Sequence, residues 1–214
     1  MIMMPNENIQ EKVEEKKIKR SDIAIAVIVF VIILSASLWV YTTYFLKEPE
    51  IKDVRLPGHE GTIYAFSYDI RETLKIPVND EEAIVDALVR SDKVNIVYKF
   101  HNESSLQDSK YFSVLMINVI SKVTTFFSYE EIILSDFPVY YIDENNTWHN
   151  STGDMIAKPN FTDATLWLVG PNTGAKDTSV TIIEKDIYIS GTSYENLIKA
   201  GDRFVLAVMG IDSV

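Results

Sequence analysis

The most apolar stretch of the chain is an uncharged run of 24 residues, Ile23–Leu46. At about 1.5 Å of rise per residue, a helix of this length extends roughly 36 Å, enough to cross a hydrocarbon layer of about 30 Å. Trp39, Tyr41 and Tyr44 lie near its C-terminal end, and aromatic rings favour the membrane surface. The pattern therefore predicts one N-terminal transmembrane helix, and we expect no other segment to span.

The flanks of this run predict its orientation. The segment before it carries five basic residues, four of them within Lys16–Arg20, whereas the basic residues after it are more widely spaced. Because strongly basic flanks stay on the cytoplasmic side, residues 1–22 are predicted to form a short inner tail and residues 47–214 to lie outside. We expect a single-pass, signal-anchored protein of the cell membrane, held in the bilayer by residues 23–46.

Other interpretations of this run remain open. It could be a buried core helix, or Ile23–Leu34 could be the core of a signal peptide that is cleaved near Ser35–Ser37. A pilin-like leader also places a basic stretch before a hydrophobic helix, but Ser21 and Asp22 stand where such leaders need Gly or Ala. The apolar run continues to Leu46 and a long polar region precedes it, which favours a retained anchor.

The remainder of the chain divides into a linker and one domain. Residues 47–62 are charged and are interrupted by two prolines and two glycines, a composition typical of a linker or an extended stalk. Residues 63–214 contain the periodic patterns of helices and strands. Helices are expected over Ala65–Leu74, Asn79–Ser91, Lys110–Phe127 and Thr192–Met209, the last beginning with a capping box and ending at Gly210.

Short apolar segments, most of them β-branched or aromatic, predict the strands. They are Val94–Phe100, Glu131–Ser135, Val139–Ile142, Ala164–Val169, Ser179–Ile183 and Ile187–Ser190. Strand, helix and strand over 94–135 predict a right-handed βαβ crossover with parallel strands, and the last two strands a hairpin. The polar residues 143–162 are expected to form an exposed loop. The fold class is α+β, or α/β, with helices packed on a mixed sheet in one compact outer domain.

Charge and composition narrow the function classes. The chain has 20 Lys and Arg against 31 Asp and Glu, for a net charge of −11, and residues 1–22 contribute none of it. An acidic outer domain argues against nucleic acid as a partner. The absence of Cys excludes a disulfide scaffold, thiol catalysis, zinc–thiolate sites and iron–sulfur clusters, and it fits a prokaryotic, for example archaeal, surface.

Four asparagines outside the predicted anchor are followed by any residue and then Ser or Thr. This is the N-glycosylation acceptor pattern, and it occurs at Asn102, Asn145, Asn150 and Asn160. Three of them lie within the predicted loop, where an oligosaccharide is accessible. The chain is therefore a candidate glycoprotein, and unmodified loop asparagines are the alternative.

No catalytic constellation emerges from the sequence. Gly170–Thr178 superficially resembles a phosphate-binding loop, but three residues separate its glycines, Ala175 intervenes before the lysine, and a hairpin follows instead of a helix. We interpret it as a turn between strands. The three histidines, His59, His101 and His149, lie in separate predicted loops without metal-ligand spacing.

Carboxylates are abundant, as in any acidic chain. Asp143, Glu144, Asp154 and Asp163 could supply oxygen ligands to Ca²⁺, but they lack the regular spacing and the turn glycine of an EF-hand loop. We therefore assign no catalytic, cofactor-binding or metal-binding residue and expect no cofactor.

These observations favour a non-catalytic, membrane-anchored surface protein. Its outer domain is predicted to bind another envelope or membrane protein, or a second copy of itself, as an accessory subunit of a cell-envelope complex. The alternative is an extracytoplasmic sensor that binds a small ligand between the sheet and the helices at Lys110–Phe127 and Thr192–Met209. An outer hydrolase with an acidic site assembled in space is a third hypothesis.

Overall fold

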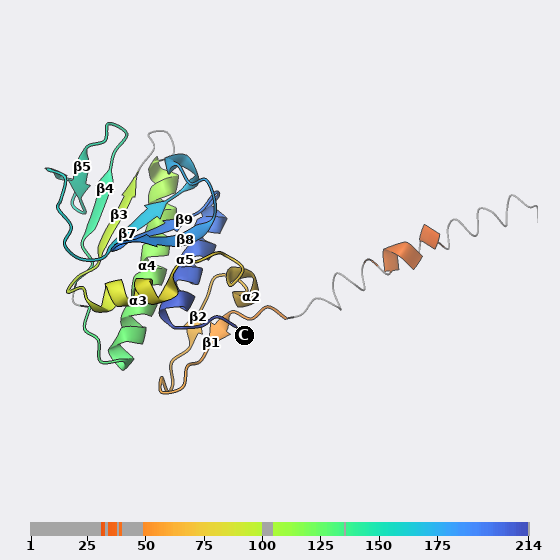
Figure 1. The fold of residues 1–214 in the computed structure, drawn as a ribbon. Coiled ribbons are helices and arrows are strands. Elements are labelled where there is room, and N and C mark those ends of the chain that lie inside the picture. Colours follow the sequence, from red (N-terminus) through yellow and green to blue (C-terminus); the bar gives the residue numbers. More distant parts are fainter. Residues whose placement is uncertain are drawn as a thin grey trace, which may run out of the picture. The chain divides into compact units, whose positions relative to one another are not determined.

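The chain divides into two units, Met1–Pro49 and Glu50–Val214. A mixed sheet of seven strands lies at the centre of the second unit. The computed structural model describes residues 31, 32, 34–37, 39, 49–99, 105–134 and 136–213. The strands follow the order β6-β5-β4-β3-β7-β9-β8 across the sheet (Figure 1). Their bounds are β3 Asn95–Lys99, β4 Val139–Ile142, β5 Trp148–Asn150, β6 Met155–Ile156, β7 Thr165–Val169, β8 Ser179–Ile183 and β9 Asp186–Ser190.

The four central strands are parallel, and antiparallel strands complete both ends of the sheet. Strand β3 pairs with β4 and β7, and β7 pairs with β9, all in parallel. Strands β5 and β6 extend one end and β8 the other, each antiparallel to its neighbour. The predicted α+β class with helices on a mixed sheet is confirmed for this unit.

Two long helices supply much of the core. The helices are α2 Ile70–Thr73, α3 Glu81–Val89, α4 Ser105–Tyr129 and α5 Tyr194–Val208. Strands β1 Asp53–Val54 and β2 Tyr64–Ala65 form a separate two-stranded sheet. Gly201 allows α5 to approach α4 closely, because a Cβ at this position would lie 2.1 Å from Leu115 Cδ1. Leu166 and Leu168 of β7 are buried in the same core. Helix α5 ends as predicted at Gly210, which has a positive φ of 69°.

The predicted crossover is present, but its second strand differs from the expectation. Strand β3, helix α4 and strand β4 form the parallel unit. The segment Glu131–Ser135, predicted to be a strand, instead begins with the turn that follows α4: Glu131 has a φ of 58°, and the Ile132 N–H donates to the carbonyl of Phe127. Ile133 is 85% exposed and Leu134 is 7% exposed, and neither belongs to a strand.

The polar segment 143–162, expected to be a loop, contains strands β5 and β6, which add to the edge of the sheet. The Asp143 side chain accepts the backbone N–H groups of Asn145 and Thr147 and thereby closes the turn between β4 and β5. This local side-chain bonding lets a polar sequence form a hairpin.

Residues 50–62 also differ from the extended stalk that their composition indicates. They belong to the compact unit, where β1 pairs with β2 in antiparallel register. His59, in the loop between these strands, is 4% exposed and stacks on Tyr129 at the end of α4. Prolines and glycines here shape a folded ribbon loop.

Most of the predicted anchor lies outside the described residues, as do the tail 1–22 and Asn102. The residues that the structure describes between 31 and 39 are helical, and Val31, Ile32, Leu34 and Trp39 are exposed. Among the described residues, one helix is long and apolar enough to cross a membrane by length and composition alone, and it is Lys110–Tyr129 within α4 and not the predicted anchor. Its residues Phe112, Leu115, Val119, Val123 and Phe127 are buried in the core of the domain.

Candidate interaction surface

The two faces of the sheet have different surroundings, because successive side chains of a strand point to opposite sides. In β7, Leu166 and Leu168 are buried on the side of α4 and α5, whereas Trp167 between them points to the opposite side and is partly exposed. In β9, Tyr188 precedes the buried Ile189 and pairs directly with Trp167. The side chains on this second face pack against one another.

Aromatic rings from several segments gather on the second face. Neighbouring ring centroids lie 5.3 to 6.5 Å apart, and the rings of Trp167 and Tyr188 are nearly parallel. All five members are partly exposed. Such amphipathic rings are enriched at protein interfaces, where they supply a large contact area at a small cost in conformational entropy. We call the following residues the aromatic face: Tyr140, Trp148, Phe161, Trp167 and Tyr188.

Beyond Tyr188 the same side of the sheet is hollowed into a shallow groove of about 450 Å³. Ile183, at the end of β8, is 64% exposed at this groove. The turn at 170–178, expected to join two strands, forms one wall, and Gly174 turns the chain there with a φ of 105°. We call it the β8–β9 groove, lined by Val169, Gly174, Ala175, Lys176, Asp177, Ser179, Thr181, Ile183, Tyr188 and Ser190.

The outer edge of β8 is closed by a segment from the start of α3. The Val180 N–H donates to the carbonyl of Pro77, and the Asn79 N–H donates to the carbonyl of Val180. The Asn79 side chain then receives the Ile182 N–H at 2.8 Å and donates to the Ile182 carbonyl at 3.0 Å. The helix expected from Asn79 begins instead at Glu81, and Asp80 caps it. A partner therefore meets this end of the sheet on its face.

Two of the described acceptor asparagines, Asn145 and Asn150, lie at or next to β5, toward the opposite end of the sheet from β8. Asn145 is in the turn after β4, Asn150 ends β5, and Asn160 precedes Phe161. Asn145 and Asn160 are exposed, whereas the Asn150 side chain bonds Thr152 and Asp154 within its own turn. Four strands separate β5 from β8, so an oligosaccharide on Asn145, in the turn before β5, would leave the β8–β9 groove open.

His149 and Asp143, unconnected in the sequence analysis, form an ion pair on the β4–β5 hairpin. His149 Nε2 lies 3.0 Å from Asp143 Oδ2, and Nδ1 lies 3.2 Å from the carbonyl oxygen of Gly153. Both partners are acceptors, so the imidazolium satisfies both contacts. The hydrogen bond that His149 donates to the Asp143 carboxylate raises the pKa of His149 and lowers the pKa of Asp143. This pair braces two turns.

His59 is likewise engaged on both sides of its ring. Its Nδ1 lies 2.7 Å from Tyr64 Oη, and its Nε2 lies 3.4 Å from Glu130 Oε1. The ring also stacks on Tyr129. Since both nitrogens contact protein groups, this histidine joins the β1–β2 loop to the end of α4 and presents no nitrogen to a ligand.

The carboxylates considered as a calcium site belong to separate local networks. Asp143 bonds its own turn and His149, while Asp154 accepts hydrogen bonds from Thr152 and Asn150, which lower its pKa. Asp163 accepts from Thr162. Within the part of the chain that the structure describes, no three His, Asp or Glu side chains gather as metal ligands.

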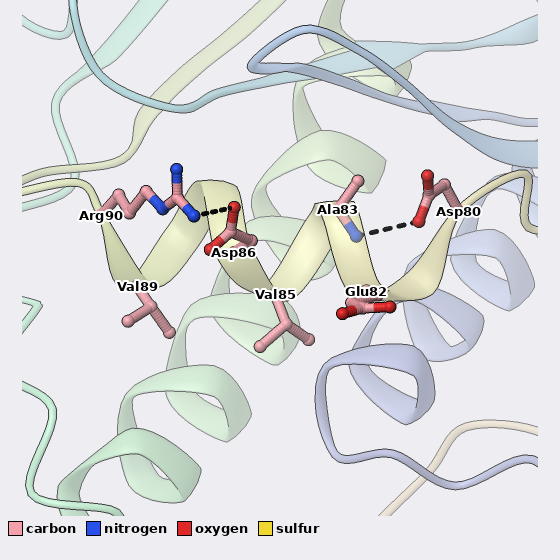
Figure 2. Close-up of a pocket in the computed structure, with 7 residues that line it drawn as sticks. All are labelled: Asp80, Glu82, Ala83, Val85, Asp86, Val89 and Arg90. Atoms are coloured by element: carbon pink, nitrogen blue, oxygen red, sulfur yellow. Dashed lines mark hydrogen bonds and ion pairs between the residues drawn. The ribbon is translucent and has the colours of Figure 1, made fainter.

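A second surface depression runs along the solvent side of α3 (Figure 2). All its lining residues lie at 80–90, on this one helix or its two flanking residues. Asp80 accepts the Ala83 N–H as the helix cap, and Asp86 pairs with Arg90 at 2.8 Å, four residues on. These charges stabilise the helix itself, so the depression has the chemistry of an exposed helix face.

The space between the sheet and the long helices, where a small ligand was the alternative expectation, is occupied by side chains. Phe112, Leu115 and Phe204 are almost completely buried there, with Ile187 and Ile189 from β9. Tyr98 of β3 stacks on Phe112 at 5.0 Å. This packing does not favour the sensor alternative.

Comparison of the chain with protein-family models, with curated proteins and with solved structures finds no match. The aromatic face was missed in the sequence analysis, although a signal for it exists. Trp167 stands between two leucines and Tyr188 between two isoleucines, the period-2 pattern of an aromatic ring that points away from a buried aliphatic face.

Proposed function

We propose that this protein is a non-catalytic, membrane-anchored surface protein whose outer domain binds a protein of a cell-envelope complex. The observation that carries the proposal is the arrangement of the sheet. Helices α4 and α5 pack on one face, while the aromatic face and the β8–β9 groove are accessible on the other. Burying partly exposed Trp and Tyr rings is a major source of binding free energy at protein interfaces.

The anchor in this proposal is the helix at 23–46, with residues 1–22 inside the cell and the folded unit outside. The uncharged length of 24 residues and the basic flank before it support this topology. The exposed apolar side chains between 31 and 39 are of the kind that lipid covers. Asn145 and Asn160 are the exposed acceptor asparagines among the described residues, and Asn150 is partly buried.

Co-purification of the full chain tests the binding function. The tagged protein is extracted from native membranes in mild detergent, sized, and analysed by mass spectrometry. We expect a stoichiometric protein partner, and we expect a Trp167→Ala/Tyr188→Ala variant to lose it by about tenfold or more, because truncated aromatic anchors at an interface typically cost over 1.4 kcal/mol.

The matched control is Ile117→Ala, which removes an apolar side chain that is 67% exposed on α4. This variant should retain the partner. Extraction of the wild-type chain as a lone monomer, or equal retention of the partner by the aromatic variant while it remains folded, would contradict the proposal.

A further inference from the structure

The residues that line the β8–β9 groove include one positive and one negative charge, on a chain that is acidic as a whole. The cation is Lys176, beside the anion Asp177. The chain as a whole carries −11, a net charge that opposes the approach of a second copy. A contact between copies is therefore least opposed where opposite charges alternate.

Neighbouring charges of opposite sign are suited to a twofold contact. In an isologous contact the same patch serves both partners, so Lys176 of one copy meets Asp177 of the other, and the reciprocal pair forms as well. No carboxylate of the described residues lies within 4 Å of the Lys176 ammonium. Asp177 accepts a hydrogen bond from the Ser179 hydroxyl, which fixes its carboxylate at the groove.

Apolar contact area lies beside the charges. Ile183 is 64% exposed, and Tyr188 and Val169 are partly exposed along the same groove. Because Asn79 closes the edge of β8, the copies would pack face to face and would not extend each other's sheets. Face packing at a bounded groove gives a closed dimer, whereas open strand edges lead to continued pairing.

We propose that the β8–β9 groove is the contact between two copies of this chain in the membrane. The inference rests on the proposed function and deepens it, since it names the partner of this surface as a second copy. Anchoring confines both copies to one plane and raises their effective concentration, so a contact of modest area is sufficient.

The absence of Cys allows a direct test in native membranes. A single Cys is introduced by Thr181→Cys in the groove or, as a matched control, by Ile117→Cys on the exposed side of α4. Membranes are treated with a short bismaleimide and the products are separated by mass. The proposal predicts that Thr181→Cys yields a cross-linked species of twice the chain mass. Ile117→Cys should yield at least about fivefold less of this species.

Charge reversal tests the pairing itself. In the Thr181→Cys background, Lys176→Asp should lower the cross-linked fraction by about tenfold, because the change acts twice across a twofold axis. The swapped variant Lys176→Asp/Asp177→Lys should restore cross-linking, since both reciprocal pairs form again with their charges exchanged. Failure of the swap to restore it would overturn the proposed pairing.

The outcomes separate this inference from the broader function. Equal cross-linking at Thr181→Cys and Ile117→Cys, or a product whose added mass differs from a second copy, overturns self-association. If the wild-type chain binds a different protein and the Trp167→Ala/Tyr188→Ala variant loses that protein, the proposed interaction function stands even though self-association is excluded. A dimer that co-purifies with no other protein supports self-association as the whole of the interaction.

Discussion

The side chain of Asn79 makes with the backbone of Ile182 the two hydrogen bonds that a neighbouring strand would otherwise make. The Asn79 side-chain amide both accepts and donates a hydrogen bond, as a peptide group does. This single residue, which precedes α3, therefore takes the place of an eighth strand at this point. Exposed strand edges promote uncontrolled pairing, and this contact protects β8 from it.

Replacing this amide should destabilise the fold and expose the edge. Asn79→Ala leaves the Ile182 N–H and carbonyl without their partner, and we expect a loss of about 1–3 kcal/mol in the free energy of unfolding. Denaturant unfolding of the full chain in detergent measures the loss, and sizing reports any new association. Asn145→Ala, in an exposed turn, is the control and should change the stability by less than about 0.5 kcal/mol.

The ion pair between α4 and α5 should couple stability to pH. Lys122 Nζ lies 3.5 Å from Asp202 Oδ1, both side chains are largely buried, and the Ser67 N–H donates to Asp202 Oδ2. Lys122→Met leaves a buried carboxylate without its cation, so we expect a loss of about 3–5 kcal/mol at neutral pH. The double variant Lys122→Met/Asp202→Asn should recover part of it.

The sign of the pH effect follows from the raised pKa of Asp202, which burial causes. Between the ordinary value of 3.8 and the raised value, the folded state binds more protons than the unfolded state, so stability falls as pH rises through this window. Loss of Lys122 extends the window upward. Unfolding of Lys122→Met at several pH values should show recovery in acid, and a pH-independent loss would contradict the ion-pair explanation.

The two tight glycines should respond differently to Ala. At Gly201 a Cβ meets the end of the flexible Leu115 side chain, whereas at Gly191 it would lie 2.2 Å from the backbone nitrogen of Leu197. We expect Gly201→Ala to cost about 1–3 kcal/mol and to be partly rescued by Leu115→Val. Gly191→Ala should cost more, since backbone cannot yield as a side chain does. The denaturation midpoints of Gly201→Ala, Gly201→Ala/Leu115→Val and Gly191→Ala measure these costs. Equal losses of stability for the two glycine variants would contradict the prediction.

His149 should titrate above the ordinary value of 6.5, because the Asp143 hydrogen bond raises its pKa. Its stabilising contribution is complete below 6.5 and is lost as pH rises through the folded-state pKa. The contribution of Asp143, whose pKa is lowered, is lost in acid as pH falls below 3.8. NMR titration of the imidazole measures the shift. Asp143→Asn should move the His149 pKa back toward 6.5, and an unchanged value would exclude the pair as its cause.

Membrane topology can be checked with the same Cys-free chain. Ser213→Cys should react with a membrane-impermeant maleimide in intact cells, because the folded unit is proposed to lie outside. Glu7→Cys should react only after permeabilisation, because the basic flank keeps the tail inside. The reverse labelling pattern, or a mature chain that lacks residues before Ser37, would contradict the proposed anchor.

The sequence alone determined the elements whose signals are local. The closing helix followed from its apolar periodicity and from Gly210, and the β8–β9 hairpin followed from two apolar segments around a polar turn. The turn at 170–178 was recognised because the glycine spacing and the following strand do not fit a phosphate-binding loop. In each case neighbouring residues supply the deciding interactions.

The tertiary structure decided where a segment adopts a structure other than the one that its local pattern predicts. The segment 131–134 has strand composition, yet it forms the turn after α4, because Ile132 packs on the core and its N–H donates to the carbonyl of Phe127. Asn79 had the chemistry of a helix cap, but a strand 103 residues away uses it. Residues 50–62 had linker composition, yet burial of His59 against Tyr129 fixes them in the domain.

The candidate surface shows the same division. Alternation within β7 and β9 indicated that Trp167 and Tyr188 point away from their aliphatic neighbours, which is local information. That both rings share a face with Trp148 and Phe161, and that α4 and α5 pack on the other side, depends on strand order across the sheet. Strand order is set by contacts between distant segments, which no local window of the sequence contains.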